Sequence, residues 1–300
     1  MKIIITGGTG LIGSALAKNL AKDGHEVILL SRRIPPSKGY PAGIRLEKWD
    51  GRTSQGWGRL ADGADAIINL AGENLSAGRW TNKRKQAILE SRANAGAAIV
   101  QAIQQATNKP RVLIQSSAVG YYGPSDVAWF SEDDAPANDF LAKVCQAWEA
   151  STQPVEALGV RRVVVRSGVV LSTRSGALPR MLLPFKLFAG GPLGSGQQWL
   201  SWVHVEDEVR ALRFLIDTAQ ARGVFNISAE PVTNRQFAQT IGKVMWRPAF
   251  FPVPAFIIRL AFGEMSTVVL DGQRVSTKRL LEMGFQYRFP KAEAALKDLL

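Results

Sequence analysis

The stretch KIIITGGTGLIG, residues 2–13, decides the fold, because it joins a short apolar run to glycines spaced three residues apart. The run Lys2–Thr6 is rich in β-branched residues, which is typical of a strand buried in a parallel sheet. A helix is predicted over Leu11–Lys22, and HEVILLSRR (25–33) supplies the next strand. A strand, a glycine turn, a helix and a second strand predict the first unit of a Rossmann-type, doubly wound α/β sheet.

The glycine turn predicts a dinucleotide-binding site. Gly7 permits the tight turn, Gly10 lets backbone N–H groups approach a pyrophosphate, and Gly13 lets the helix pack on the strand. The helix begins with Leu11 and Ile12, whose amides have no partner within the helix, and the helix dipole favours a phosphate there. A glycine triplet alone is a weak signal, but this one lies between a strand and a helix, as the motif requires.

The end of the second strand indicates which dinucleotide binds. Sites that prefer NAD place an Asp or Glu here to hold the adenosine ribose 2′-OH, whereas a nearby Arg accommodates the 2′-phosphate of NADP. The strand ends Ser31-Arg32-Arg33, without an acid. We therefore expect Arg32 to bind the 2′-phosphate, with Ser31 as a further hydrogen-bond donor, and NADP(H) to be preferred over NAD(H). Taken alone, two adjacent arginines are more often a solvated basic turn.

A second group of small residues ends a predicted central strand, Ala66–Leu70. The strand runs into Asn69-Leu70-Ala71-Gly72, which offers little side-chain bulk. Ligands of doubly wound sheets bind at the carboxyl ends of the strands. These four residues are therefore expected to line the cofactor site.

One cation interrupts the apolar face of a long predicted helix, roughly Asn82–Ala106. Apolar residues recur at helical spacing, among them Ile88, Ala95 and Ile99, and Arg92 lies within that stripe. A buried guanidinium needs a partner, because an unpaired buried charge is costly. Two partners are equally compatible with the sequence: a carboxylate of another segment, or the diphosphate of the cofactor.

The composition narrows the class of protein. The 37 basic and 25 acidic residues give a net charge of +12, but the cations are scattered in pairs and triplets, and no nucleic-acid-binding module is recognisable. An anionic cofactor or substrate accounts for this balance, so no nucleic-acid partner is expected. Cys145 is the single cysteine and the two histidines lie far apart, so neither a disulfide framework nor a metal site is predicted.

The distribution of apolar residues also bears on location. The apolar start, KIII, is too short for a signal peptide and lacks a cleavage site, and no long charge-free apolar run occurs elsewhere. We therefore expect a soluble, cytoplasmic protein without a membrane partner.

The order of strand and helix patterns predicts two parts. Strands and helices alternate through the first half, which indicates a parallel sheet. Farther on the pattern changes, and the C-terminal part is mostly helical with proline punctuation. We expect an NADP(H)-binding Rossmann domain over 1–170. A smaller, mostly helical substrate domain is expected over 171–300, with one or two excursions back to the sheet.

The motif order resembles that of the extended short-chain dehydrogenase/reductases, the NAD-dependent epimerase/dehydratase superfamily. The matching segments are GGTGLIG (7–13), the turn at Asp50, NLAG (69–72), SSAVGYYG (116–123), RSGVVL (166–171) and WVHVEDEVRAL (202–212). More narrowly, an atypical branch called "epimerase family", with some members labelled cell-division inhibitor, is matched by GENLSAGRW (72–80), LLPFKLFAGGPLGSGQQWLSWVHVEDEV (182–209) and LDGQRVSTKRLLEMGF (270–285). The resemblance spans the chain and implies a Rossmann-type fold, a nicotinamide dinucleotide, and cofactor contacts at Asp50 and Gly168.

The resemblance also implies a catalytic set. The superfamily uses a Tyr-x-x-x-Lys pair, in which the lysine holds the nicotinamide ribose and lowers the tyrosine pKa, and a serine on the preceding strand orients the carbonyl. Carried onto this chain, the lysine is Lys143 and the serine is Ser117, with Ser116 second. The residue four before Lys143 is Asp139, so the usual tyrosine is absent.

Three interpretations of this gap stay open. In the first, Asp139 carries the proton, although a nearby lysine should lower its pKa and its position suits a helix N-cap. In the second, Tyr122, or next Tyr121, supplies the hydroxyl from the GYYG loop, unless both rings only pack beside the cofactor. In the third, the chain binds NADP(H) without turnover.

We expect NADP(H)-dependent oxidoreductase or epimerase chemistry on an unidentified small-molecule substrate, with Ser117, Tyr122 and Lys143 as catalytic residues. The alternative is a non-catalytic NADP(H)-binding sensor or regulatory protein, so the sequence leaves open whether the chain is an enzyme. Relatives with this fold often dimerise through two long helices, and a homodimer is compatible with the sequence.

Overall fold

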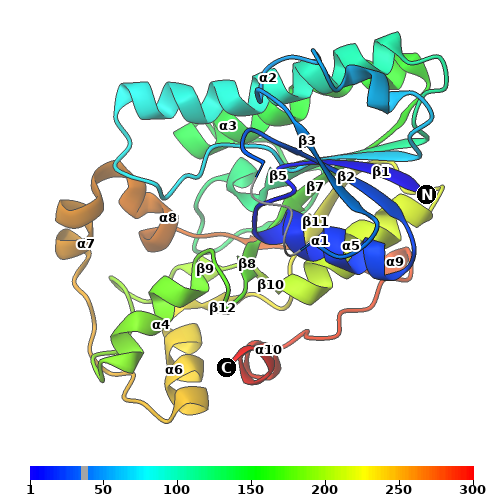
Figure 1. Cartoon of the computed structure of the whole chain (residues 1–300). Helices are drawn as coiled ribbons and strands as arrows, with labels where there is room; N and C mark the ends of the chain where they lie inside the picture. Colours follow the sequence, from blue (N-terminus) through cyan, green and yellow to red (C-terminus); the bar gives the residue numbers. More distant parts are fainter. Residues whose placement is uncertain (35–39) are drawn as a thin grey trace.

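A computed structural model describes residues 1–34 and 40–300 (Figure 1). Its main feature is a seven-stranded parallel sheet in the spatial order β11-β7-β5-β4-β1-β2-β3. The strands are Lys2–Thr6 (β1), Glu26–Ser31 (β2), Ile44–Lys48 (β3), Ala66–Asn69 (β4), Val112–Ala118 (β5), Arg161–Ser167 (β7) and Gly223–Ile227 (β11). The predicted doubly wound α/β fold is confirmed. The sequence between β2 and β3 includes a polar stretch with prolines and glycines, residues 34–43, and part of it lies outside the described residues.

The strand order reverses between β1 and β4. The chain runs outward from β1 through β2 to β3, then returns to the other side of β1 and continues through β4, β5 and β7 to β11. Thr6 at the end of β1 is in register with Leu30 on one side and with Asn69 on the other. In sheets of this kind, ligands bind outside the carboxyl ends of the strands at such a reversal.

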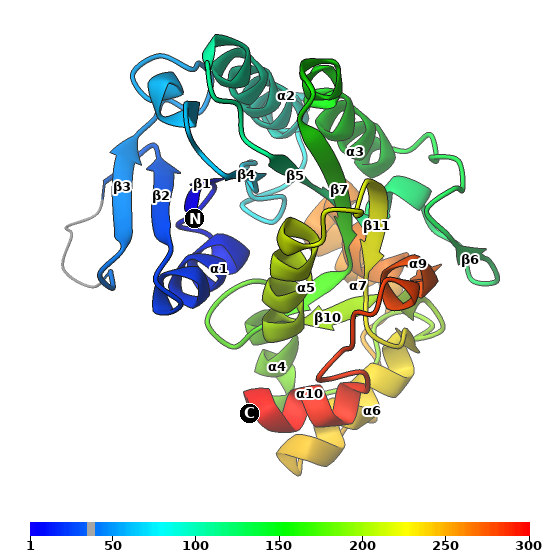
Figure 2. The ribbon, with the colours of Figure 1, turned by 90° about the vertical axis from the view of Figure 1, so that its right-hand side faces the viewer.

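Helices cover both faces of the sheet, α1 and α5 on one and α2 and α3 on the other (Figure 2). Successive strand residues face opposite sides, and β1 illustrates the result. Ile3 and Ile5 are buried with α1 and α5, whereas Ile4 is buried with α2. The helices are Leu11–Lys22 (α1), Asn82–Gln105 (α2), Phe140–Ala150 (α3) and Val205–Asp217 (α5).

A smaller lobe with its own core follows β7. Leu178, Trp202, Phe237 and Leu296 are buried together in that core. The lobe's helices are α4 (Leu178–Lys186), α6 (Asn234–Met245), α7 (Ala255–Phe262), α8 (Thr267–Leu270) and α10 (Ala292–Leu299). The short helix α9 (Lys278–Glu282) packs on β11 of the main sheet instead. The short strands are β6 (Trp129–Phe130), β8 (Val169–Leu171), β9 (Trp199–Leu200), β10 (Trp202–His204), β12 (Val232–Thr233) and β13 (Arg274–Val275).

Two segments of the C-terminal half return to the main sheet: 205–227, with α5 and β11, and 278–282, where α9 packs on β11 and Leu280 is buried in the main core. α5 packs against α1, and β11 pairs with β7 as an edge strand. These are excursions of the kind that the sequence predicts. The division at residue 170 into an NADP(H)-binding domain and a smaller substrate domain stays a prediction.

Candidate functional site

A cavity of about 860 Å³ opens at the carboxyl ends of β1, β2 and β4. It lies where the strand order reverses, which is the position that a doubly wound sheet offers to a ligand. Eight of the predicted cofactor residues line it: Gly7, Gly10, Ser31, Arg32, Asp50, Leu70, Ala71 and Gly72. The other predicted residues lie outside its lining: Leu11, Ile12, Gly13, Asn69, Arg92, Lys143 and Gly168.

The glycine turn has a geometry that suits a dinucleotide. Gly7 has a φ of +65°, and a Cβ there would lie 2.5 Å from the carbonyl oxygen of Leu70. A Cβ at Gly13 would lie 2.6 Å from the Gly7 carbonyl oxygen, so only glycine lets α1 approach the turn this closely. Gly10 is the N-cap of α1 and has no side chain to accept from the first helical amides. Those amides are therefore available to an anion.

The side chains of the first helical residues serve packing. The Cδ2 of Leu11 would lie 3.0 Å from a Cβ at Gly176, so Leu11 contacts the smaller lobe. Ile12 packs against the core between α1 and the sheet. The side chains of Leu11 and Ile12 therefore serve packing, and contact of their amides with a cofactor stays a prediction.

Arg32 and Glu73 form an ion pair at the edge of the cavity. Arg32 follows β2 and Glu73 follows β4, on the two sides of β1, and their N–O distance is 2.6 Å. Arg84 of α2 approaches the other carboxylate oxygen of Glu73 at 3.3 Å. The hydrogen bond from Arg32 is the main cause that lowers the pKa of Glu73, so the carboxylate is charged at neutral pH. Arg32 thus already has an anionic partner at the edge of the cavity.

Ser31 and Asp50 shape the same edge through local hydrogen bonds. Ser31 Oγ donates to the carbonyl oxygen of Arg33 at 2.6 Å. Asp50 Oδ1 accepts from the backbone N–H groups of Arg52 (2.7 Å) and Thr53 (2.9 Å), which closes the turn after β3. Both side chains line the cavity, but their strongest contacts are with the backbone around them.

Asn69 bridges three strands. Its Oδ1 accepts from Thr6 Oγ1 at 2.7 Å, and its Nδ2 donates to Gln115 Oε1 at 2.9 Å. The side chain is fully buried. Asn69 therefore fixes β1, β4 and β5 relative to one another through side-chain hydrogen bonds. It affects the cavity indirectly, because it fixes the backbone that continues into Leu70 and Ala71.

Arg92 lies behind the cavity wall. Its side chain stacks on the ring of Trp148, 4.7 Å from the centroid, and Nη1 donates to the carbonyl oxygens of Ile88 (3.0 Å) and Glu73 (3.2 Å). A Cβ at Gly72 would lie 2.8 Å from the Arg92 Cζ. Gly72 therefore separates the guanidinium from the cavity, and any larger residue there would push it away.

Arg92 is a buried cation that backbone carbonyls and an aromatic ring hold in place. Within the ranges 1–34 and 40–300, no carboxylate forms an ion pair with it. Burial lowers its pKa to about 10, which leaves it charged at neutral pH. The predicted carboxylate partner is thus not seen, and contact with a cofactor diphosphate stays a prediction.

A buried polar network occupies the position that the resemblance assigns to catalysis. Ser117 Oγ donates to Glu149 Oε1 at 2.6 Å, and Arg166 makes two hydrogen bonds to the same carboxylate, at 2.8 and 2.9 Å. Burial opposes the charge on Arg166, but the hydrogen bonds and charge of Glu149 outweigh it and raise the pKa of the guanidinium. Ser117 is therefore oriented by a carboxylate of α3.

The two tyrosines of the GYYG loop join this network in different ways. Tyr122 is 3% exposed, and its hydroxyl donates to Asn226 Oδ1 (2.8 Å) and accepts from Arg166 Nη1 (3.0 Å). Burial is the main cause that raises the pKa of Tyr122 to about 12. The ring of Tyr121 lies 3.3 Å from the Arg166 guanidinium and is half-buried. An acid–base role for Tyr122 would require its hydroxyl to leave Asn226, and that role stays a prediction.

The remaining predicted residues lie around α3 and β8. Asp139 is the N-cap of α3, since its Oδ1 accepts from the Ala142 N–H at 2.9 Å. Lys143, one turn farther, is exposed. A Cβ at Gly168 would lie 2.7 Å from the Ser201 carbonyl oxygen, so Gly168 allows close packing of the backbone before β8 on that before β10. Catalytic or cofactor contacts of Lys143 and Gly168 stay predictions.

Two residues of the network, Glu149 and Arg166, were not among the predicted site residues. A signal for Arg166 was present, because it ends the apolar run VVV of a buried strand and a buried cation needs a partner. No sequence rule identifies that partner. Glu149 reaches Arg166 only because α3 packs against β5, the strand beside β7.

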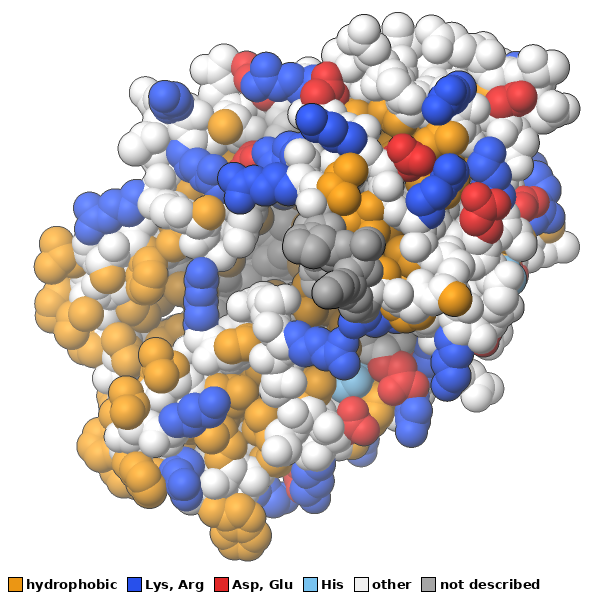
Figure 3. Space-filling model, in the orientation of Figure 1, with side chains coloured by type: hydrophobic (Ala, Val, Ile, Leu, Met, Phe, Trp, Pro, Cys, Tyr) orange, Lys and Arg blue, Asp and Glu red, His pale blue; other side chains and the backbone are white. Residues whose placement is uncertain are grey.

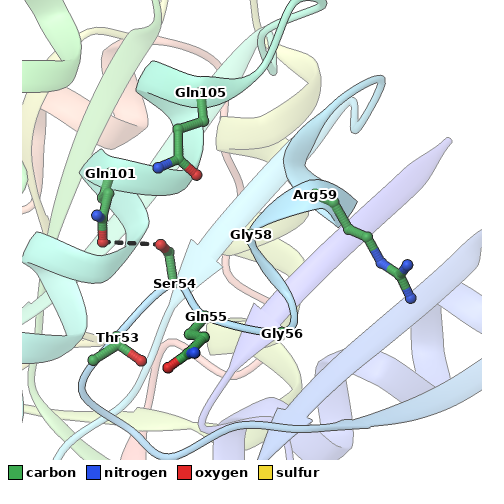
Figure 4. Close-up of a pocket in the computed structure, with 8 residues that line it drawn as sticks. All are labelled: Thr53, Ser54, Gln55, Gly56, Gly58, Arg59, Gln101 and Gln105. Atoms are coloured by element: carbon green, nitrogen blue, oxygen red, sulfur yellow. Dashed lines mark hydrogen bonds between the residues drawn. The ribbon is translucent and has the colours of Figure 1, made fainter.

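A second hollow, of about 630 Å³, lies between the segment 53–59 and α2 (Figure 4). Its side chains are mainly neutral and polar, and Ser54 Oγ donates to Gln101 Oε1 at 2.9 Å. Arg59 is its one charged lining residue, and Figure 4 shows that side chain directed away from the glutamines of α2. The hollow offers no acid–base pair and no set of metal ligands, so we place no function there.

Comparison with protein families and relatives gives matches along the whole chain. Residues 3–228 match the model of the NAD dependent epimerase/dehydratase family, and residues 253–299 match a domain of unknown function, DUF1731. Epimerase family protein YfhF of Bacillus subtilis is 42% identical over 311 residues, which cover 100% of this chain and 98% of that protein. The mouse epimerase family protein SDR39U1 is 38% identical over 310 residues, with 100% of both chains covered.

Solved structures agree with these matches. The crystal structure of human epimerase family protein SDR39U1 (isoform 2) with NADPH has a TM-score of 0.89 and 38% identity, covering 100% of this chain and 99% of that one. A UDP-galactose 4-epimerase has a TM-score of 0.76 at 20% identity, covering 99% of this chain and 97% of that one. The second likeness concerns the fold alone.

Proposed function

This chain belongs to the NAD dependent epimerase/dehydratase family, and from that premise we propose that it binds NADP(H) and performs oxidoreductase or epimerase chemistry on a small molecule. The observation that carries the proposal is the cavity beside β1. There the backbone of the glycine turn leaves room for a diphosphate, and Arg32 lies at the edge where a 2′-phosphate would bind. The NADPH bound by the human relative supports this choice of cofactor.

The charged side chains that line the cavity are balanced, so the support for an anionic ligand comes from a cation behind the wall and from the start of α1. Arg92 is a buried cation directly behind Gly72, and no carboxylate in the described part of the chain pairs with it. A positive charge in low-dielectric surroundings favours an anion nearby, even without direct contact. The amides at the start of α1 add to this effect. A dinucleotide diphosphate bound between the glycine turn and Gly72 would interact favourably with both the Arg92 charge and the amides of α1.

The proposed chemistry places hydride transfer beside Ser117. A bound nicotinamide supplies or accepts the hydride. Because Ser117 already donates its proton to Glu149, its remaining lone pairs suit a hydroxyl donor of the substrate. We assign Lys143 to the nicotinamide ribose and Tyr122 to the proton. For that role the Tyr122 hydroxyl must exchange its bond to Asn226 for one to the substrate.

A non-catalytic, NADP(H)-binding role is the second candidate, and one observation favours it. The superfamily's tyrosine position holds Asp139, which caps α3, and the hydroxyl of Tyr122, our first alternative, is buried and already hydrogen-bonded. A protein without an accessible proton carrier would still bind the cofactor, and binding would then serve as a signal of NADP(H) rather than as a step in turnover. The two candidates share the cavity and differ in turnover.

The test begins with cofactor binding. The purified chain, freed of any carried-over nucleotide, is titrated with NADPH and with NADH by calorimetry. One charge-assisted contact to the 2′-phosphate is worth roughly 1.5–3 kcal/mol, so NADPH should bind about ten- to hundredfold more tightly. Equal affinities would contradict the assignment of Arg32, and no binding of either would contradict the proposed function.

A second measurement separates the two candidates. NADPH oxidation and NADP reduction are followed by nicotinamide absorbance against panels of carbonyl compounds, alcohols and sugar nucleotides. Turnover of any member supports the enzyme. Tight NADPH binding without turnover across the panels would favour the sensor.

A further inference from the structure

α7 has an almost entirely apolar surface. Of its eight residues, AFIIRLAF, only Ile258 is buried. Phe256 is 68% and Leu260 76% exposed, and Ile257 and Phe262 are each 45% exposed. A helix that is apolar on all sides is normally buried, because its surface is stabilised by leaving water. The described part of the chain leaves most of this helix uncovered.

The exposed apolar surface continues onto two neighbouring segments. In the loop 246–251, Trp246 is 88% and Phe250 71% exposed. At the end of α4, Leu187 is 68% exposed. We call the exposed apolar side chains of α7, of 246–251 and of 183–188 the lobe face. Surface leucines and phenylalanines are common singly, but a continuous group of this kind marks an interaction site.

Contacts between the segments show that the lobe face is continuous. The Phe251 N–H donates to the Gly190 carbonyl oxygen at 3.0 Å, which ties the loop to the segment after α4. The Arg247 guanidinium lies 4.3 Å from the ring centroid of Phe188. Figure 3 shows hydrophobic side chains gathered along the left edge of the molecule, from α7 down to the end of α4.

The two stretches of sequence that carry the lobe face have charges of one sign, although Glu264 and Asp271, which follow α7, lie close to it. The two stretches that contain it, 161–205 and 231–263, include no Asp or Glu. They do include exposed cations, among them Lys186 at the end of α4 and Arg259 within α7. Glu264 is paired with Lys85, so the unpaired charges within the two stretches are cations. Apolar and aromatic side chains edged mainly by Lys and Arg complement a surface that is apolar inside and negatively charged outside.

We propose that the lobe face docks on an anionic lipid bilayer. Its aromatic and aliphatic side chains would enter the boundary between headgroups and acyl chains, where Trp and Phe are favoured, and Lys186 and Arg259 would lie among the phosphates. Docking is peripheral, since no helix of the described chain combines the length and the hydropathy that crossing a bilayer requires. This departs from the expectation of no membrane partner, which considered only long apolar runs.

A second copy of the chain fits the lobe face less well than lipid. Two lobe faces pressed together would bring the cations of both copies together, with no carboxylate in either stretch to pair with them. Lipid docking also leaves the cofactor cavity accessible, because its lining comes from residues 7–94 and shares no residue with the lobe face. The protein could therefore bind NADP(H) while docked.

The experiment compares sedimentation with vesicles of phosphatidylglycerol and phosphatidylcholine against sedimentation with vesicles of phosphatidylcholine alone. The unmodified chain should sediment with the anionic vesicles, and less so as salt is raised. The double variant Phe256→Ser, Leu260→Ser should partition about tenfold or more weakly, because it removes two large side chains that would leave water. Leu281→Ser, at a residue 47% exposed on α9 and outside the lobe face, is the matched control and should bind normally.

Three outcomes would overturn the proposal: no sedimentation with anionic vesicles, equal sedimentation of the double variant, or equal sedimentation with both lipids. A concentration-dependent dimer of the unmodified chain, abolished in the double variant and accompanied by no vesicle binding, would assign the lobe face to a second copy instead. Thermal melting followed by circular dichroism checks that each variant is folded. Little change is expected, because the substituted side chains are exposed.

Discussion

Two arginine–glutamate pairs lie beside the strand ends of the same sheet, and they differ in their access to water. The side chains of Arg32 and Glu73, at the cofactor cavity, are 66% and 24% exposed. Those of Arg166 and Glu149, beside Ser117, are 3% and 13% exposed. The N–O distances are similar, 2.6 and 2.8 Å, so geometry alone does not distinguish the pairs.

The difference teaches that burial decides what an ion pair can do. An exposed pair is worth little, about 0–1 kcal/mol, so a ligand can replace one partner at small cost. A buried pair is hard to open, because the charge left behind has neither water nor a partner. We infer that the ion pair at the cavity edge is exchangeable, with Arg32 passing from Glu73 to a 2′-phosphate, whereas the pair of Arg166 and Glu149 that orients Ser117 is fixed before any ligand arrives.

The largest expected effect is on stability, at the buried pair. Glu149→Gln keeps the shape of the side chain but leaves the Arg166 guanidinium without its counter-charge, which should lower the free energy of unfolding by about 3–5 kcal/mol. Urea unfolding followed by circular dichroism measures this. Glu26→Gln breaks the exposed pair with Arg45 and is the matched control, with an expected change of at most about 1 kcal/mol. Equal effects would refute the contrast drawn from burial.

The next effect concerns turnover. Tyr122→Phe removes the hydroxyl to which we assign the proton, so the rate on any active substrate should fall by about a hundredfold or more. Asp139→Asn keeps a good N-cap and should change the rate little. A full rate in Tyr122→Phe would make Tyr122 a purely structural member of the buried network. A large loss in Asp139→Asn would assign the proton to that carboxyl.

The third effect is on cofactor choice at the exposed pair. Arg32→Ala should reduce the preference for NADPH over NADH by about ten- to hundredfold, because the 2′-phosphate loses a charge-assisted hydrogen bond. Calorimetric titration of both cofactors measures the change. Arg33→Ala, next in the chain and also at the cavity, is the control and should retain the preference. If Arg33→Ala has the larger effect, the two arginines must exchange their roles.

The smallest expected effect shows whether the Glu73 carboxylate competes with the cofactor's 2′-phosphate for Arg32. If Glu73 competes with the 2′-phosphate for Arg32, then Glu73→Gln should bind NADPH about two- to fivefold more tightly, since a half-exposed pair is worth up to about 1 kcal/mol. NADH binding should change less, because NADH has no 2′-phosphate. Weaker NADPH binding in this variant would mean that Glu73 holds Arg32 in place for the cofactor.

The cofactor end of the molecule was largely predictable from the sequence. Local rules predict strand β1, the glycine turn and α1. The β-branched run, the positive φ at Gly7 and the helix start without a capping side chain each require particular residue types, which can be read from the sequence. The same holds for Arg32, whose place at the end of β2 follows from counting along one βαβ unit. Its pairing with Glu73 does not follow, because that contact depends on how β2 and β4 flank β1.

The surroundings of Arg92 and Ser117 could not be predicted in the same way, because they depend on tertiary contacts between segments far apart in the sequence. Arg92 was recognised as a cation on a buried face, yet its partners are backbone carbonyls and Trp148, which neither expected alternative included. Asp139 could be recognised as an N-cap because capping is local. Glu149 could not be recognised as the partner of Ser117, because that contact needs the docking of α3 on β5.

The return of α5 and β11 to the sheet has a consequence for how the chain is made. Leu16 and Leu20 of α1 are buried in one cluster with Leu212 and Leu215 of α5. On the ribosome, α1 therefore emerges long before the helix that covers it, and the edge of β7 stays open until β11 is synthesised. The nascent first half must keep an apolar helix face and a strand edge exposed during that interval. We therefore expect the first half to complete its folding only after residues 205–227 appear, and chaperones to have the greatest opportunity to bind before then.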